Sequence, residues 1–131
     1  MRTFRWTDFD LPSTLKLAPL EKILLEPVSK IGKKLERIKL GLHEALVNAV
    51  VHGNKRDFSK RIRVRRIVTP NWFVWQIQDQ GNGTPRDARV SALPSQIEAE
   101  SGRGFFLIHE CFDDVRWSHR GNRIQVACKR T

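Results

Sequence analysis

The stretch GLHEALVNAVVHGNK, residues 41–55, is the most informative segment of the chain. Its apolar residues predict a buried helix, yet Glu44, Asn48 and His52 recur along it at intervals of four. Because each helical residue advances by about 100°, these three polar side chains share one strip of the helix surface. The opposite face, which we expect to pack on a sheet, carries Leu35, Ile38, Leu42, Ala45 and Ala49.

The polar strip is unusual for a surface that faces solvent, because its neighbours are Leu40, Val47 and Val51. Enclosing a carboxylate and an amide without partners costs several kcal/mol. Two interpretations remain open from this helix alone. Either a ligand, a metal or a water cluster lies along the strip, or a neighbouring loop forms hydrogen bonds to it.

The order of elements predicts an α+β protein, with residues 1–131 as a single domain. We expect strands at residues 3–9, 61–69, 72–79, 114–119 and 123–130, and helices at 11–32, 33–52 and 104–112. Residues 80–103 are expected to form a long loop, with one short helix near 94–99. Paired strands with few helices indicate a two-layer α/β sandwich, in which helices cover one face of a mixed, mostly antiparallel sheet.

Length and composition exclude several classes of protein. No apolar run approaches the roughly 20 residues of a membrane helix, and the N-terminal residues lack the apolar core of a signal peptide. These features predict a cytoplasmic protein. Cys111 and Cys128 have no metal-binding spacing, so we expect two reduced thiols in or near the core.

The charge of the chain is strongly positive, with a formal net charge of +10, which favours an anionic partner. Residues 55–66 contain seven lysines and arginines, and strand alternation would place Arg61, Arg63 and Arg65 on one face. This face is either the solvated outer side of a sheet or a docking surface for an acidic partner. Trp72 and Trp75 lie on an otherwise apolar strand, where we expect both in the core.

A first glycine motif follows the strand that ends near residue 79. In IQDQGNG, residues 77–83, Asp79, Gly81 and Gly83 have D-x-G-x-G spacing. Glycine allows the backbone to turn and to approach a ligand closely, and the aspartate can accept a hydrogen bond from an amino group. A tight turn with a capping aspartate explains the motif equally well when it is considered alone.

A second glycine motif is SGRGFFLIHECFDDV, residues 101–115, in which Gly102 and Gly104 are predicted to precede a helix. The free N–H groups of a helix N-terminus suit a phosphate, and Arg103 adds a full positive charge there. Considered alone, the motif is also typical of a glycine-rich helix start.

Together, and in this order, HEALVNAVVHGN, DQGNG and GRGFFLIHECFDDV resemble the N, G1 and G2 boxes of the gyrase, histidine-kinase and MutL-type ATPases. The chain is most similar to the anti-sigma factor serine/threonine kinases of the SpoIIAB and RsbW type, over roughly residues 35–128. The resemblance implies a Bergerat-type ATP-binding fold. It also implies ATP and Mg²⁺ as cofactors, and an antagonist protein and a sigma factor or similar regulator as partners. A homodimer is left open.

The resemblance also implies residue roles. Glu44 would be the general base, and Asn48 would bind the Mg²⁺ that bridges the phosphates. Asp79 would accept a hydrogen bond from the adenine amino group. The glycine motifs would place the backbone beside the base and around the phosphates, through Gly81, Gly83, Gly102, Arg103 and Gly104. Asn122 departs from the pattern, because many relatives have a threonine there.

The sequence allows two alternatives to the kinase and excludes two others. One is a nucleotide-binding regulator without activity that sequesters a partner, and another is a basic nucleic-acid-binding module. The sequence leaves the first alternative open, since Glu44 is present. A histidine phosphoacceptor at His43 would need a dimerisation helix pair, for which the chain leaves no space. A zinc protease is excluded, because H-E-x-x-H would need histidine where Val47 stands.

Overall fold

The computed structural model of the chain describes residues 5–86, 89 and 100–131. The strands are β1 (Thr7–Pro12), β2 (Arg61–Val68), β3 (Trp72–Gln78), β4 (Asp114–Trp117) and β5 (Arg123–Lys129). The helices are α1 (Ala18–Leu24), α2 (Lys34–Asn48) and α3 (Glu100–Cys111), with a 3₁₀ turn η1 (Glu26–Val28) and a π-helical turn η2 (Ala49–Gly53).

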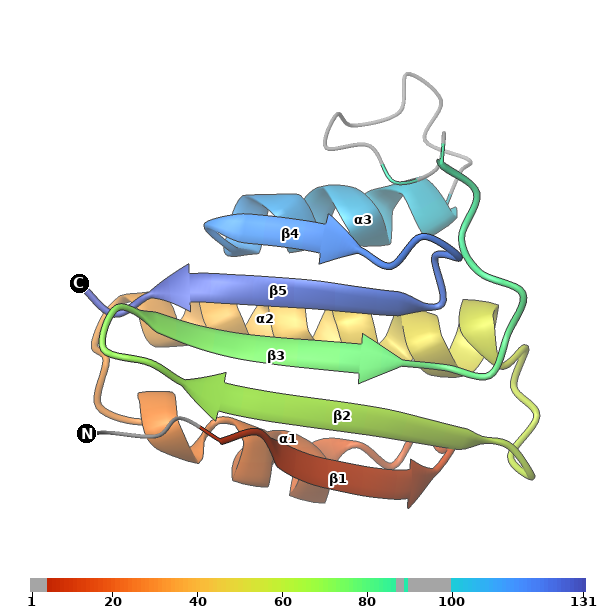
Figure 1. Cartoon of the computed structure of the whole chain (residues 1–131), viewed down its shortest axis with the longest axis horizontal. Coiled ribbons are helices and arrows are strands. Elements are labelled where there is room, and N and C mark those ends of the chain that lie inside the picture. Colours follow the sequence, from red (N-terminus) through yellow and green to blue (C-terminus); the bar gives the residue numbers. More distant parts are fainter. Residues whose placement is uncertain (1–4, 87–88, 90–99) are drawn as a thin grey trace.

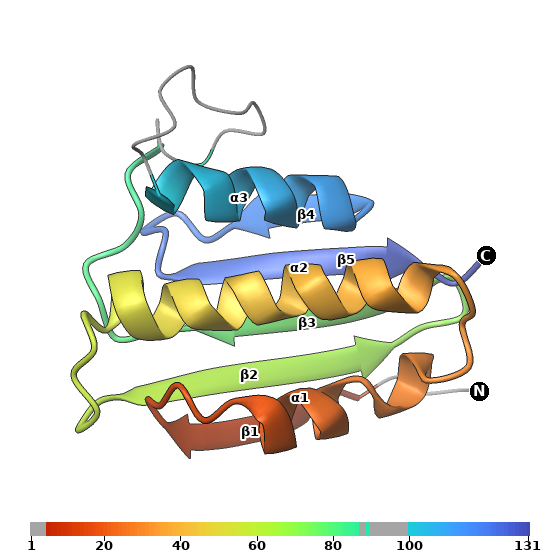
Figure 2. The ribbon, with the colours of Figure 1, turned by 180° about the vertical axis from the view of Figure 1, so that it is seen from behind.

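The five strands form one sheet in the order β1-β2-β3-β5-β4, and each neighbouring pair is antiparallel. One face of the sheet is open in Figure 1, whereas Figure 2, seen from behind, shows α1, α2 and α3 covering the other face. The predicted two-layer α+β sandwich is therefore confirmed.

The core lies between the sheet and α2. Ile38, Leu42, Leu46 and Val50 are fully buried, so the buried face of the helix is wider than the sequence predicted. It is wider because α3 covers a second side of α2. At Gly41 a Cβ atom would come within 2.6 Å of Cys111, the last residue of α3, and of Phe112, which follows it, so a glycine is required for the two helices to approach this closely.

Prolines explain why the predicted helix at 11–32 is broken. Pro12 ends β1, whereas Pro19 and Pro27 lie in the first turns of α1 and η1. Proline is tolerated there because those N–H groups have no partner within the helix. The sequence predicted a helix over 11–32 with both prolines near ends or kinks. The prolines do lie at helix starts, but the segment forms the end of β1, α1 and η1 and not one helix. The first strand also spans residues 7–12 rather than 3–9.

The other predicted elements agree with the structure within a few residues, apart from two. The helix predicted at 33–52 changes at Ala49 from α to π geometry, for which the sequence gives no clear signal. The helix predicted at 104–112 begins earlier, at Glu100. The short helix predicted near 94–99 lies outside the described residues.

The open face of the sheet carries the predicted row of arginines, but the row is paired with carboxylates. Arg61 Nε donates to Asp10 Oδ1 at 2.7 Å, and Arg63 and Arg65 both form ion pairs with Asp8 on β1. The antiparallel register of β1 and β2 places Arg65 directly opposite Asp8, and the other two pairs are diagonal, two positions along the strand. The row is therefore largely neutralised within the sheet.

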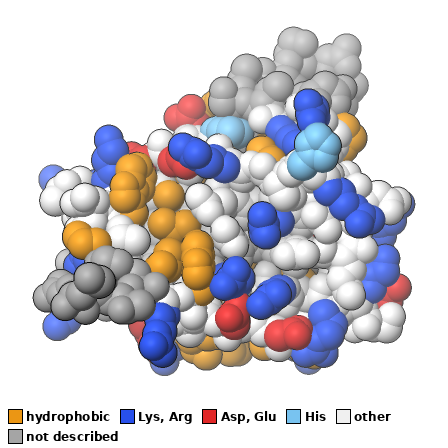
Figure 3. All heavy atoms as spheres, viewed as in Figure 1, with side chains coloured by type: hydrophobic (Ala, Val, Ile, Leu, Met, Phe, Trp, Pro, Cys, Tyr) orange, Lys and Arg blue, Asp and Glu red, His pale blue; other side chains and the backbone are white. Residues whose placement is uncertain are grey.

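The two tryptophans of β3 lie on opposite faces, because they are three residues apart. Trp75 is fully buried and its Nε1 donates to the Leu24 carbonyl at 3.0 Å. The strand alternation puts Trp72 on the open face, where it is half-buried, so the prediction of a core position for Trp72 was wrong. In Figure 3 hydrophobic side chains gather toward one side of this face, and lysines and arginines occupy much of the rest.

Cys111 and Cys128 are free and buried, as predicted. Burial raises the pKa of both thiols, which keeps them protonated and unreactive at neutral pH. Within the described part of the chain, no helix combines the length and apolarity needed to span a membrane.

Candidate nucleotide-binding site

A pocket lies at the end of the sheet where β3 stops, between the sheet and the last turns of α2. Its walls come from the helix end, the loop after β3, α3 and the β4–β5 turn, and they include Asn48, Gly53, Asp79, Thr84, Phe105 and Asn122. The pocket therefore brings together the first two sequence motifs, which are far apart in the chain.

Asn48 is the polar group at the bottom of this pocket. Its Nδ2 is buried and has no hydrogen-bond partner among the described residues. A buried amide left unpaired costs about 1–3 kcal/mol, so such groups are uncommon in native proteins. The neighbouring-loop interpretation of the polar strip finds no support at Asn48, whereas an amide without a partner fits a ligand site.

Asp79 stands directly after the last residue of β3. Its Oδ1 accepts a hydrogen bond from Gly81 N–H at 2.8 Å, and its own N–H donates to the Asn122 carbonyl at 2.9 Å. Burial raises the pKa of the Asp79 carboxyl above 3.8, although the Gly81 hydrogen bond and the nearby Lys60 and Arg120 oppose this shift. A half-buried carboxylate held in this way is poised to accept a hydrogen bond from a ligand.

The glycines around Asp79 are needed because backbone segments touch there. A Cβ atom at Gly81 would collide with the Gly53 carbonyl, and one at Gly83, where φ is +97°, would collide with the Arg120 carbonyl. The loop after β3 is thus pressed against both the helix end and the β4–β5 turn. Only glycine permits this packing without strain.

Asn54, a fully buried polar residue beside the pocket, was not predicted from the sequence as part of the site. Its Oδ1 accepts from Gln80 N–H at 2.8 Å and its Nδ2 donates to the Arg61 carbonyl at 3.0 Å. One side chain therefore links the end of α2 and η2 to both β2 and the loop after β3. In the sequence, Gly53 and Asn54 predict only the end of the helix, so nothing there indicates this role.

Glu44 and His52 are placed differently from Asn48, although all three lie on one strip. Glu44 is half-buried but is not among the residues that line the pocket. His52 lines the pocket but is largely exposed. Of the apolar flanks, Val47 and Val51 are half-buried, whereas Leu40 is 45% exposed and encloses little.

The glycines of the second glycine motif, residues 101–115, lie inside α3 and not ahead of it. The helix begins at Glu100 and includes Gly102, Arg103 and Gly104, which corrects the predicted start. The first four N–H groups of any helix, counted from its N-cap, lack partners within it, and in a helix that begins at Glu100 the last of them is that of Gly102. Phe105, which follows Gly104, lines the pocket and packs edge-on against Trp117 at 5.2 Å between ring centroids.

The site suits Mg²⁺ only together with a phosphate ligand. No group of three His, Cys, Asp or Glu side chains in the described ranges could hold a metal by itself. Mg²⁺ commonly takes one or two protein oxygens and completes its shell with water and substrate phosphates. Asn48 lines the pocket, and its amide oxygen is the kind of ligand that Mg²⁺ accepts, whereas the unpartnered Nδ2 can donate a hydrogen bond to a phosphate oxygen.

Curated relatives of the chain are anti-sigma F factors. The protein from Geobacillus stearothermophilus is 29% identical over 85 residues, and that from Anoxybacillus flavithermus is 31% identical over 85 residues. Each alignment covers 63% of this chain but only 58% of the relative. The anti-sigma F factor of Clostridium perfringens strain SM101 is 26% identical over 102 residues, covering 75% of this chain and 73% of the relative.

Comparison with protein families matches residues 24–128 to the histidine kinase-like ATPase domain. The match includes α2, the loop after β3 and α3, so it covers the whole pocket. The chain therefore belongs to the histidine kinase-like ATPase family, and it resembles the anti-sigma factors within that family.

Proposed function

We propose that the chain binds ATP with Mg²⁺ in this pocket and transfers phosphate to a serine or threonine of a small antagonist protein. We further propose that it binds and sequesters a sigma factor or a similar regulator. The observation that carries the proposal is the unpartnered amide of Asn48 in the same pocket as the half-buried carboxylate of Asp79. The family match and the anti-sigma F relatives support it.

In this proposal each residue has a separate task. Asp79 accepts a hydrogen bond from the adenine amino group, and Asn48 holds the Mg²⁺. The metal neutralises charge on the phosphates when it is bound. Gly81 and Gly83 keep the loop beside the base, and the start of α3, with Gly102, Arg103 and Gly104, lies beside the phosphates and offers them the free N–H of Gly102. Glu44, one helical turn before Asn48, takes the proton of the acceptor hydroxyl as its oxygen bonds to phosphorus and ADP leaves.

A second candidate function is a nucleotide-binding regulator that sequesters its partner without transferring phosphate. The observation that favours it is the position of Glu44, which does not line the pocket. Nucleotide binding is common to both candidates, so only a transfer assay separates them.

The test uses the whole chain with radiolabelled ATP, Mg²⁺ and purified antagonist-type proteins from the same genome. We expect label on the antagonist with the wild type, no label with Glu44→Ala, and unchanged ATP affinity for Glu44→Ala by calorimetry. Label that persists with Glu44→Ala contradicts the assigned base. Absence of ATP binding at millimolar concentration by the wild type contradicts the whole proposal.

A further inference from the structure

The loop between η2 and β2, residues 54–60, has an unusual combination of rigidity and exposure. Phe58 is 58% exposed, the highest value among the large hydrophobic side chains that the structure describes as exposed. The hydrogen bonds of the loop keep this side chain in its exposed position.

Hydrogen bonds fix the loop on both sides of Phe58. Arg56 N–H donates to the Val50 carbonyl at 2.9 Å and Lys60 N–H donates to the Asp57 carbonyl at 3.1 Å. The Asp57 carboxylate also accepts from the N–H of Ser59 at 3.0 Å. Asn54, fully buried, anchors the start of the loop. The backbone therefore presents Phe58 to solvent in a defined position.

Two consecutive residues in the loop hold strained backbone conformations. Lys55 and Arg56 have φ values of 54° and 59°, which non-glycine residues adopt rarely. The conformation turns the chain sharply after η2 and leaves both side chains exposed. Lys55 also lines the mouth of the groove next to the nucleotide pocket, with Asp79 and Gly83. The loop thus borders the site.

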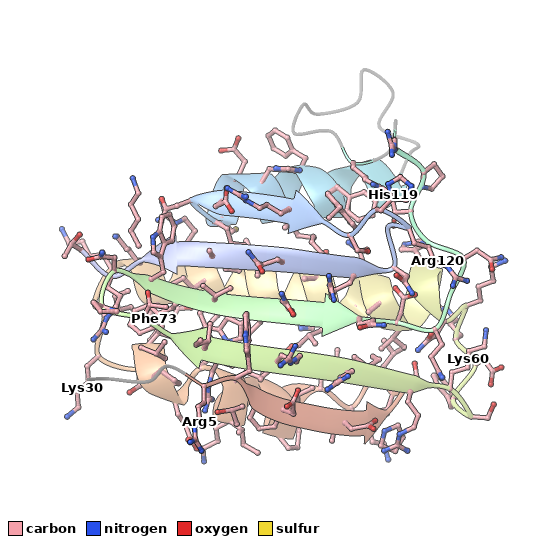
Figure 4. The ribbon with its side chains drawn as sticks, in the orientation of Figure 1. Arg5, Lys30, Lys60, Phe73, His119 and Arg120 are labelled. Carbon is pink, nitrogen blue, oxygen red and sulfur yellow. The ribbon has the colours of Figure 1, made fainter. Side chains whose placement is uncertain are left out.

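Positive charge concentrates at the same end of the molecule. The three loops that meet there, residues 52–60, 79–86 and 118–123, contain six lysines and arginines against two aspartates, which gives them a net charge of +4. Figure 4 shows Lys60 and Arg120 at this end, with Arg5 and Lys30 at the opposite end. In the described part of the chain, Lys55, Lys60 and Arg120 take part in no ion pair.

This distribution separates the two halves of the basic run 55–66. The strand half, with Arg61, Arg63 and Arg65, is paired with Asp8 and Asp10. The loop half keeps its charge available. An exposed aromatic side chain on a fixed backbone with free cations around it has the composition of an interface hot spot, in which an aromatic anchor is buried and charges steer the encounter.

We propose that residues 54–60 form a docking loop for an acidic protein, with Phe58 inserted into an apolar recess and Lys55, Lys60 and Arg120 facing carboxylates. The proposal goes beyond the proposed function, because docking here does not require phosphate transfer. A protein fits better than a nucleic acid, since the loop joins an exposed aromatic side chain to cations without ion pairs, which is the composition of a protein interface hot spot.

The test selects binders from a displayed library of random peptides against the wild-type chain, with Phe58→Ala as the counter-selection target. We expect peptides with an apolar residue between acidic residues. Fluorescence anisotropy should show affinity reduced about tenfold or more by Phe58→Ala and by Lys55→Glu with Lys60→Glu. Binding should also weaken between about 0.05 M and about 0.3 M salt.

Matched controls at other sites should leave peptide affinity unchanged. Ile23→Ala removes another exposed apolar side chain, 42% exposed on α1, and Lys30→Glu reverses an exposed charge at the opposite end. Phe58→Ala and the two controls should keep the melting temperature and the ATP affinity of the wild type, whereas Lys55→Glu with Lys60→Glu is expected to weaken ATP binding too, because both lysines lie near Asp79. Absence of ATP binding by the wild type would count against the nucleotide site and not against the docking loop, so the two failures can be told apart.

Three results would overturn the proposal. The first is a selection that yields no peptides, or peptides that bind Phe58→Ala as tightly as the wild type. The second is binding of a random-sequence DNA duplex that Lys55→Glu with Lys60→Glu weakens and Phe58→Ala does not, which would make the charges a nucleic-acid surface. The third is self-association in sedimentation that Phe58→Ala abolishes, which would make a second copy the occupant.

Discussion

The backbone N–H of Gln80 donates a hydrogen bond to Asn54 Oδ1 at 2.8 Å, across 26 positions of sequence. Gln80 in turn accepts from Arg61 N–H through its own Oε1 at 2.7 Å, and Asn54 donates to the Arg61 carbonyl. The three residues therefore close a ring of hydrogen bonds. This ring holds the strand end that carries Asp79 against the end of the helix that carries Asn48.

Asn54→Ala should weaken both the fold and the nucleotide site. It leaves the Gln80 N–H and the Arg61 carbonyl without partners, which should cost roughly 2–5 kcal/mol in the free energy of unfolding. Denaturant unfolding measures this cost, and calorimetry should show weaker ATP binding because the Asp79 loop is no longer held. Asn71→Ala, at an exposed position in the β2–β3 turn, is the control and should change neither quantity.

Asp79→Asn should weaken ATP binding strongly, since an amide presents an N–H group where the adenine amino group needs an acceptor. The same change should reduce the pH dependence of stability. Because the folded state raises the pKa of this carboxyl, the folded chain binds more protons than the unfolded chain just above pH 3.8. Stability contributed at this residue therefore falls as pH rises through that window.

The measurement for Asp79 is a series of denaturant unfolding curves from about pH 4 to pH 7. Relative to Asp79→Asn, the wild type should lose stability as pH rises. Parallel pH profiles for the two proteins would contradict a raised pKa at Asp79. Asp114→Asn, on β4 and outside the residues that line the pocket, serves as the comparison.

Asn48→Ala should separate ligand binding from stability. The buried Nδ2 has no partner among the described residues, so its removal should cost little stability or increase it by up to about 1 kcal/mol. Mg²⁺-dependent ATP binding should nevertheless weaken, whereas binding measured in the presence of a chelator should change less. A large loss of stability in thermal unfolding without ligand would mean that Asn48 is a structural residue.

The triple variant Arg61→Ser, Arg63→Ser, Arg65→Ser tests the sheet face that the sequence singled out. Exposed ion pairs contribute about 0–1 kcal/mol each, so the loss of stability should be modest and should shrink at high salt. Because Asp8 and Asp10 already neutralise this row, we expect the selected acidic peptides to bind the variant nearly as well as the wild type. If the triple variant lost as much peptide affinity as Phe58→Ala, the docking surface would lie on β2 and not on the loop.

The sequence predicted the fold well where periodicity and glycine spacing are strong, and less well where contacts with distant elements determine which side chains are buried. The hairpin of β2 and β3 and the location of Asp79 followed from alternation and turn residues. The burial of Leu46 and the exposure of Trp72 did not follow from the sequence. The burial of Leu46 depends on α3, which covers a second side of α2, and the position of Trp72 depends on which face of the sheet its side chain takes. Asn54 was missed for the same reason: both of its partners come from other elements.

The charge pattern shows a similar limit. Alternation correctly put the three arginines on one face, but the aspartates that neutralise them come from β1, about 50 positions earlier in the chain. The positions of Glu44 and Asn48 on one strip also followed from the sequence. Whether both reach the same pocket depends on the geometry of the helix end, which the pattern does not specify.

The π-helical turn at Ala49–Gly53 has a consequence for the phase of the helix. A π turn contains about one residue more than an α turn, so residues before and after it are offset by roughly 100° relative to a continuous α-helix. Deleting one residue within Ala49–Gly53 would remove this offset and rotate Asn54 away from Gln80 while Asn48 stayed in place. The π turn therefore changes the direction in which the following residues point, so that Asn48 faces the pocket and Asn54 faces the strands.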